Sequence, residues 1–460
     1  MGKRVGIVLG MILIAGLAFF LLTSVQRPAD QAFNAARPAL VQQTPNKQPD
    51  ETGPAGADTS NSLPAEMLDG ALEKATEPAT IREGIRSDQV PEDNGLHWFL
   101  LAAELVPADE DRFWELREDI FENGWKEDPR IAREFERLGP AFEAIRKGLE
   151  VGNVSFPQMD VDEQMPYLAK WRELGRMMTL QALMDFSQGR YDSAAGQFAA
   201  IFDFATESSR NGFVVTHLIG YAIQETGAQQ LCKTLQLPAV SAEQCRAIMT
   251  RIQEIDSTAP RIAEAVRLET DVFSQWFKDN SASPERCRSF IEMIMPSEDR
   301  EFVKLARAAT PDQLSEWCRQ LAESAEQAAP LFEAPFYEFD RAKFEQIAAA
   351  NRLTQGLVKA YGRLSEAEAR GKLFRSGSIL VAALETYRHE NGAYPKSLDA
   401  LAPSVLGELP KDPFTGQPFR YALKSGSYSL YSAGKNMKDD GGEGDSFDFS
   451  QDDYVLASPN

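Results

Sequence analysis

Apolar residues recur at helical spacing from about Asp93 to Leu373, which predicts that the centre of the chain is almost wholly α-helical. Asp93 and Asn94 precede the first apolar stretch, where a helix prefers a side chain that caps its amino terminus. Later helices are expected to start near the residues that interrupt the pattern, which are Gly212, Ser241, Pro260, Pro284, Pro311 and Asp340. Because alternating strand patterns are nearly absent here, we expect one all-helical domain over residues 66–365.

One pair of these helices forms a hairpin pattern. The segment LQALMDFSQGRYDSAAGQFAAIFDFA ends the apolar-periodic helix Tyr167–Phe186 and leads through Gly189 into a second helix. It resembles a tetratricopeptide hairpin, in which small residues let two helices approach closely while larger ones, here Tyr191 and Phe198, fill the gap. The repeat period of that family does not recur on either side, so an ordinary helical bundle is the alternative to a repeat array.

The pattern changes at the carboxy-terminal end. A long amphipathic helix is expected over Glu366–Glu390, and Asn391-Gly392 ends it because these residues tolerate a left-handed backbone. Ser397 can cap a short helix through Leu401. Alternating apolar and polar positions then predict strands at Pro418–Leu423, Tyr428–Ser432 and Tyr454–Leu456. We therefore expect a small α+β domain over residues 366–460, with a long helix followed by a β-meander.

Three motifs in this domain carry a family resemblance. They are ALETYRHENGAYPKSLDAL, LPKDPFTGQPFRY and YSLYSAGKNMKDDGGEGDSFDF, in that order. Together they resemble the globular head of the major pseudopilins of type II secretion, whereas the helical centre only loosely resembles uncharacterised bacterial envelope proteins. The same residues also have plain structural uses: Asp412-Pro413 and Gly416 are expected to build a loop that aims the hairpin.

The amino-terminal end departs from that family. Residues Met1–Ser24 contain no prepilin peptidase junction and no acidic residue, and the head lies far from this segment. We therefore expect that the chain is not assembled into a pseudopilus and that the head is a reused terminal module. The resemblance points to a role linked to type II secretion or to surface assembly.

The amino-terminal segment itself predicts a membrane anchor. Val5–Val25 is free of charge and almost wholly apolar, which is about the length that a helix needs to cross a bilayer. Lys3 and Arg4 precede it and place the amino terminus in the cytoplasm. A cleaved signal peptide is the alternative, and both interpretations export the rest of the chain. We expect an anchor over residues 1–26 in the inner membrane and a flexible tether, rich in Pro, Ala and Gln, over residues 27–65.

Composition adds limits on partners. The chain has 460 residues, of which 43% are hydrophobic, so it can bury a sizeable core. Its formal net charge of −21 repels nucleic-acid backbones and argues against general nucleic-acid binding. The expected partner is an unidentified protein of the cell envelope.

Four cysteines leave several interpretations open. None of the four cysteines forms a Cys-x-x-Cys pair, so the sequence gives no sign of a zinc site or a thioredoxin-type centre. Cys232 and Cys245 flank a turn between two predicted helices, and Cys287 and Cys318 lie on later helices that could also meet. A disulfide in either place and four buried thiols are the alternatives.

No residue pattern indicates catalysis. Of the three histidines, His97 and His217 lie on apolar helix faces and are expected in the core, while His389 is expected to be solvated. There is no nucleophile elbow, P-loop, zincin motif or dinucleotide fingerprint. We therefore expect a tethered binding or scaffold protein and no enzyme. The alternative is an extracytoplasmic hydrolase with a cryptic site in the helical domain, which a cleft with paired carboxylates or a His–acid pair would favour.

One candidate ion site follows from the resemblance. Oxygen-bearing side chains and glycines crowd the loop between Ser432 and Asp453, and the acidic positions include Asp440 and Asp452. Calcium takes such hard oxygen ligands, although the spacing is not that of an EF-hand. Because major pseudopilins hold calcium in the matching loop, the resemblance implies a calcium site with Asn436, Asp439, Asp445 and Asp448 as ligands, assisted by carbonyls near Leu430 and Ala433. The alternative is a solvated acidic loop without an ion, and Asn436 in place of the family's usual Asp lowers the expected affinity.

Overall fold

The structure is a computed structural model that describes residues 84–106, 113–157, 165–294, 300–349, 361–424, 426–442 and 453–457. The expected anchor at residues 1–26 and the tether at residues 27–65 lie outside these ranges. Within them, no helix is both long and apolar enough to cross a membrane.

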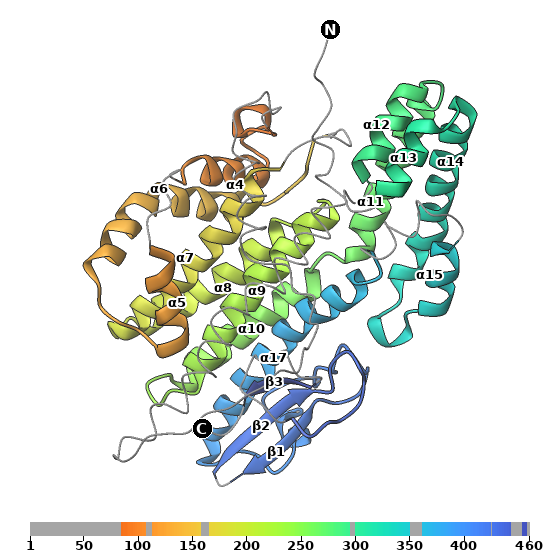
Figure 1. Ribbon diagram of the computed structural model, residues 1–460. Helices are drawn as coiled ribbons and strands as arrows, with labels where there is room; N and C mark the ends of the chain where they lie inside the picture. The colour runs from red at the N-terminus through yellow and green to blue at the C-terminus, as the bar shows by residue number, and fades with distance from the viewer. Residues whose placement is uncertain are drawn as a thin grey trace, which may run out of the picture. The chain divides into compact units, whose positions relative to one another are not determined.

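The described chain is mainly helical and ends in a small antiparallel sheet (Figure 1), which confirms the expected order of a helical region, a long helix and a β-meander. The α-helices are α4 (Gly95–Glu104), α5 (Phe113–Asn123), α6 (Pro129–Val151), α7 (Tyr167–Ser187), α8 (Tyr191–Glu207), α9 (Val214–Leu235), α10 (Ala242–Thr258), α11 (Ile262–Asn280), α12 (Pro284–Ile294), α13 (Arg300–Ala308), α14 (Pro311–Ala328), α15 (Arg341–Ala348) and α17 (Leu364–Asn391). Short 3-10 helices are η2 (Ser87–Gln89), η3 (Ala329–Glu333), η4 (Phe336–Glu338) and η5 (Leu398–Leu401). The strands are β1 (Arg420–Lys424), β2 (Ser427–Ser432) and β3 (Tyr454–Ala457).

Side-chain caps begin several helices where the sequence predicted them. Asn94 accepts a hydrogen bond from the Leu96 amide at the start of α4. Ser241 forms a capping box at the start of α10, and Thr310 forms another at the start of α14. These caps satisfy amide groups that have no partner within the helix, which fixes where each helix begins.

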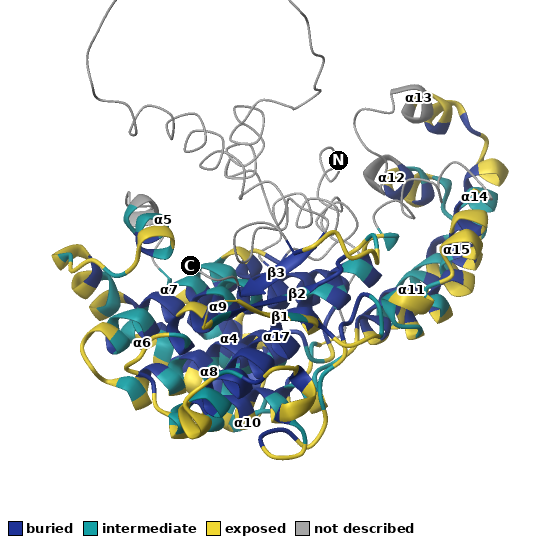
Figure 2. Cartoon of the chain, turned by 90° about the horizontal axis from the view of Figure 1, so that it is seen from below, coloured by how far each residue is buried: buried dark blue, intermediate teal, exposed yellow. Residues whose placement is uncertain are grey.

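The long helix α17 lies at the centre of the fold. It packs against α9 and α10, and its middle section, from about Leu373 to Thr386, is buried on every side. Figure 2 shows the same burial along α9 and α17, with exposed residues on the outer helices. A Cβ added at Gly371 would lie only 2.3 Å from the Tyr221 ring of α9, so the two helices approach as closely as the glycine allows. The expected boundary at residues 365/366 falls in the first turn of this helix.

The sheet covers one side of α17. It has the order β1-β2-β3, and in the hairpin Arg420 pairs with Tyr431 and Lys424 with Ser427. Leu456 of β3 packs against Gly377 of α17, where an added Cβ would lie 2.8 Å from the leucine side chain. The helix α17 and the sheet therefore share one apolar layer.

A second, smaller core lies among α11, α12, α13 and α14. Its buried members are Cys287, Phe290, Ile291, Ala306, Ala309, Leu314, Cys318 and Leu321. Phe273 and Trp276 of α11 pack against it, with the Trp276 and Phe290 rings 4.6 Å apart. We call this cluster and the helices that form it the α11–α14 lobe.

Candidate functional site

The loop that precedes the hairpin is held by one buried carboxylate. Asp412 is almost fully buried; its Oδ1 accepts hydrogen bonds from the Phe414 amide and the Ser432 hydroxyl, and its Oδ2 accepts them from Thr415 and the Ala433 amide. Burial raises the pKa of Asp412, and these four donors act in the opposite direction. The expected role of Asp412 in aiming the hairpin is confirmed, because it joins its own loop to the end of β2.

Two of the four candidate calcium ligands lie in the described part of the next loop. Asn436 donates to Asp440 at 2.7 Å and accepts from the Lys438 amide at 2.8 Å. Asp439 accepts from the Tyr431 hydroxyl at 2.9 Å, and its other oxygen lies 3.1 Å from Nε of Arg420. The described half of the expected ligand set is thus engaged in hydrogen bonds within the loop and to the hairpin.

Asp445 and Asp448 lie outside the described residues. Within the described ranges, no group of three acidic, histidine or cysteine side chains is placed to hold a metal ion. The acid that stands out is Asp453, which is 2% exposed. Its Oδ2 accepts from the amides of Asp440 and Gly442, whereas its Oδ1 has no hydrogen-bond partner among the described residues. Sequence reasoning included Asp453 in the acidic loop but did not select it, because only burial distinguishes it from its neighbours.

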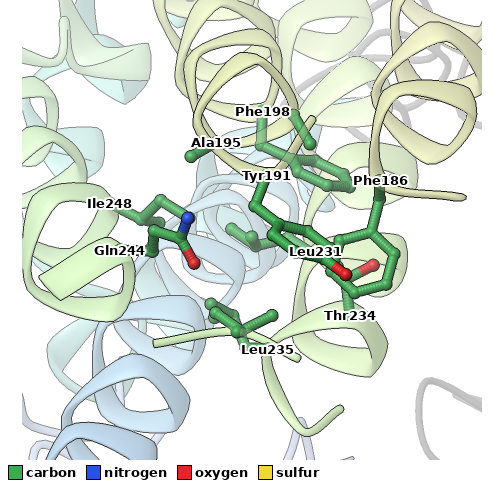
Figure 3. A pocket seen from close by; sticks show the side chains of 11 residues that line it. Phe186, Tyr191, Ala195, Phe198, Leu231, Thr234, Leu235, Gln244 and Ile248 are labelled. Carbon is green, nitrogen blue, oxygen red and sulfur yellow. The ribbon is translucent and has the colours of Figure 1, made fainter. Parts of the chain in front are cut away.

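A different site lies among the helices. A shallow surface pocket of about 250 Å³, with its open mouth included, lies between the α7–α8 hairpin and helices α9 and α10 (Figure 3). Its lining is mostly apolar and consists of Phe186, Tyr191, Ala194, Ala195, Phe198, Leu231, Thr234, Leu235, Val240, Gln244 and Ile248. The enclosed space within it holds about one water molecule, so the pocket is far smaller than a small-molecule site of about 300–1,000 Å³. A partner side chain can enter only if the lining residues move apart.

The turn of the α7–α8 hairpin shapes this pocket. The carboxylate of Asp185, which is buried, accepts hydrogen bonds from Arg190 and from Ser193, and its backbone carbonyl accepts from the Arg190 amide. Gly189 takes a φ of 75°, which brings α8 back along α7. This closed turn places the Phe186 and Tyr191 rings 5.1 Å apart at one wall of the pocket.

The mouth of the pocket is acidic. Gln244, on the α10 wall, donates to Asp192 at 2.8 Å, so the exposed carboxylate of Asp192 lies at the opening. The structure gives Asp192 no basic partner among the described residues. A positively charged group next to an apolar side chain would therefore complement both the mouth and the lining.

The helical core also contains ionisable groups away from the pocket. Glu269 of α11 accepts hydrogen bonds from the Val214 amide at the start of α9 and from the Tyr361 hydroxyl. Burial raises the pKa of Glu269 to about 7. Arg375 of α17 is 7% exposed and donates to Asp256 at 2.6 Å and to Gln224 at 2.9 Å. These groups join helices to one another, which is a structural role.

His217 and His389 lie where the sequence predicted them, whereas His97 is only half-buried at the edge of the core. His217 is 1% exposed, and burial lowers its pKa to about 3, so it is neutral in the core. The Nδ1 of His97 lies 2.8 Å from the Ser87 carbonyl and 2.9 Å from the Val90 carbonyl, which ties α4 to η2. His389 is exposed at the end of α17.

The cysteines are all buried and reduced in the structure. Cys232 lies 3.8 Å from the Ser378 hydroxyl of α17, and Cys245 lies on α10. Cys287 and Cys318 instead lie in the same buried cluster of the α11–α14 lobe.

Comparisons of the chain with known protein families, with characterised proteins and with solved structures found no match.

Proposed function

We propose that the protein is a membrane-anchored, extracytoplasmic binding or scaffold protein that captures a protein partner in the pocket between α7, α8, α9 and α10. The observation that carries this proposal is the pocket's chemistry: a small, mostly apolar surface depression with an acidic residue at its mouth. The lining supplies hydroxyl and amide groups but no carboxylate or imidazole, which suits binding more than hydrolysis.

The proposed occupant is an apolar side chain flanked by basic residues on an envelope protein. The net charge of −21 supports a basic partner, because complementary charge speeds encounter and orients the two surfaces. The small residues Ala194 and Ala195 and the short turn at Gly189 give the α7–α8 hairpin the close approach that is typical of tetratricopeptide hairpins, a family that uses such surfaces to hold peptides.

Filling the pocket tests this proposal. Full-length protein would be extracted from membranes in detergent, and its co-purifying proteins compared between the wild type and Ala195→Phe, which places a ring in the pocket. The matched control is Ala132→Phe on α6, where the residue is exposed and far from the pocket in sequence. We expect a partner that is retained by the wild type and the control, lost with Ala195→Phe, and released by raised salt. Equal recovery with both variants would contradict the pocket as the docking site.

The location is a separate part of the proposal. It rests on the charge-free segment Val5–Val25 behind Lys3 and Arg4. A cysteine added in the tether, Ser60→Cys, should react with a membrane-impermeant maleimide in intact spheroplasts, since the four native cysteines are buried. Reaction only after lysis would place the body in the cytoplasm and would overturn the proposed location while leaving the pocket proposal standing.

We also propose, from the pseudopilin resemblance, that the carboxy-terminal loop holds calcium. Asn436, Asp439, Asp445 and Asp448 remain the expected ligands, and the partnerless Oδ1 of buried Asp453 supports the presence of a cation, because a buried carboxylate oxygen without a partner is costly. The ion would supply structural cross-linking of the loop to β3. Arg420 beside Asp439 works against it, since calcium would have to displace or share that contact.

A further inference from the structure

Two of the four thiols are placed together in the α11–α14 lobe. Cys287 lies on α12 and Cys318 on α14, and both side chains are fully buried. The Cys287 thiol donates a hydrogen bond to the Asn280 carbonyl at 3.7 Å. Both belong to the same apolar cluster, and the two helices that carry them pack against each other. The chain thus brings together two side chains that lie 31 positions apart in sequence, since 318 − 287 = 31.

The other two cysteines have different neighbours. Cys232 faces Ser378 of α17 at 3.8 Å, and burial raises its pKa to about 12. Cys245 lies on α10 near Glu385 and Arg388 of α17. The geometry therefore favours one pairing and disfavours the link between Cys232 and Cys245 that their closeness in sequence allows.

We propose that Cys287 and Cys318 are a redox pair that closes a disulfide between α12 and α14. The oxidant is a disulfide-bearing compound or protein. One thiol loses its proton and attacks a sulfur of the oxidant, which forms a mixed disulfide and releases one thiol. The second cysteine then loses its proton and attacks the mixed disulfide, so that the protein disulfide forms, two protons and two electrons leave the protein, and the oxidant ends as two thiols.

The surroundings indicate what the bond would do. The lobe has a small core, and small cores gain most from a covalent link. Burial raises the pKa of both thiols, so the exchange is slow in the closed lobe and proceeds during folding or on local opening. Once formed at a fully buried position, the bond is shielded from external thiols. It acts as a structural link that keeps α12 on α14.

The experiment uses the purified full-length protein, which is reduced, unfolded in denaturant and refolded in the presence of oxidised glutathione. We expect a mass lower by two hydrogen atoms and, after denaturation and alkylation without reductant, a cross-linked peptide that joins Cys287 to Cys318 while Cys232 and Cys245 are alkylated. We also expect the melting temperature to rise by several degrees on oxidation and to return on reduction.

Variants separate this pair from general thiol oxidation. Cys318→Ala should abolish both the mass loss and the thermal shift, and the matched control Cys245→Ala should keep both. If Cys318→Ala does not fold, the peptide map of the wild type alone decides the matter. Four alkylated cysteines after oxidation, or a cross-link that contains Cys232 or Cys245, would overturn the proposal.

Discussion

Glu269 shows how one buried residue can make stability depend on pH. Its carboxylate bonds the first amide of α9 and the Tyr361 hydroxyl, yet burial dominates and raises its pKa to about 7. In the unfolded chain the same group has its ordinary pKa of 4.5. Below that value the carboxyl is protonated in both states, and the folded protein carries no penalty. Between that value and about 7, the unfolded chain ionises while the folded carboxyl stays protonated, so stability falls as the pH rises, and the loss is complete once the pH passes the folded pKa.

The first prediction is that Glu269→Gln removes this dependence. Relative to the variant, the wild type should lose stability between about pH 4.5 and pH 7.5, by at most roughly 3 kcal/mol, because each unit of pKa shift corresponds to about 1.4 kcal/mol. Urea unfolding at several pH values measures the free energy of unfolding of both proteins. Because the other ionisable groups are the same in both, the difference between them reports on Glu269. A difference that stays constant with pH would show that Glu269 ionises freely in the folded protein.

Asp453 is the residue that carries the second prediction. If calcium binds the loop, the melting temperature of the full-length protein should be higher in millimolar calcium than in chelator. A ligand at about 100 times its Kd stabilises by about 2.7 kcal/mol. Asp453→Asn should shrink that difference, whereas Asp399→Asn, an exposed acid on η5, should leave it unchanged. Equal melting with and without calcium for the wild type would mean that the loop is merely acidic.

At the scale of elements, glycines set how closely helices pack. Gly220 of α9 faces α8, and an added Cβ would lie 2.5 Å from the Ala205 carbonyl oxygen, a backbone atom that cannot move without moving its helix. Gly196 of α8 is exposed, and an added Cβ there meets nothing within 4 Å.

The third prediction therefore compares two substitutions with the same chemistry. Gly220→Ala should destabilise the protein by about 1–3 kcal/mol, because it overpacks the contact between α8 and α9. Gly196→Ala should stabilise it by up to about 1 kcal/mol through helix propensity. Thermal or urea unfolding measures both. Equal effects of the two substitutions would show that α8 and α9 can separate at no cost.

The helix starts were largely predictable from the sequence, and their positions in space were not. Ser241, Pro284, Pro311 and Asp340 lie at or next to the first residues of α10, α12, α14 and α15, because capping and proline effects are local. The helix α13 was not among the predicted starts, and the residues just before it, 295–299, are outside the described ranges.

The candidate sites also divide into features that are local in sequence, which could be predicted, and features that depend on packing, which could not. The acidic loop could be predicted because its residues are neighbours in sequence. The burial of Asp453 could not, since it depends on how β3 returns to the sheet. The pocket draws residues from four helices, and Cys287 and Cys318 share one buried cluster only because α12 packs on α14. Neither the pocket nor the cysteine cluster leaves a local pattern in the sequence from which it could be predicted.

At the scale of the whole molecule, the helical region and the carboxy-terminal α+β region share the helix α17. The division at residues 365/366 was expected from the change in pattern, and it stays a prediction. Yet α17 supplies the surface on which α9 and α10 pack, and Arg375 bonds Asp256 of α10 and Gln224 of α9.

The fourth prediction concerns a truncated chain. Residues 84–363, which lack α17, should fail to unfold cooperatively and should aggregate, because the apolar faces of α9 and α10 would be exposed to water. The matched control is residues 84–460, which keep α17 and the sheet. Circular dichroism melts and size-exclusion chromatography compare the two. A shorter chain that is monomeric and melts cooperatively would establish residues 66–365 as a domain in its own right.

The central place of α17 also has a consequence for the order of synthesis. The ribosome makes this helix long after the partners that surround it: Cys232 and Ser378, which touch in the folded protein, are 146 residues apart. At about 5–20 residues per second, translation would leave α9 waiting on the order of ten seconds for the helix that covers it. During that interval the nascent chain lacks the helix against which α9 and α10 pack. The core of this chain is therefore completed only near the end of synthesis, when α17 has been made.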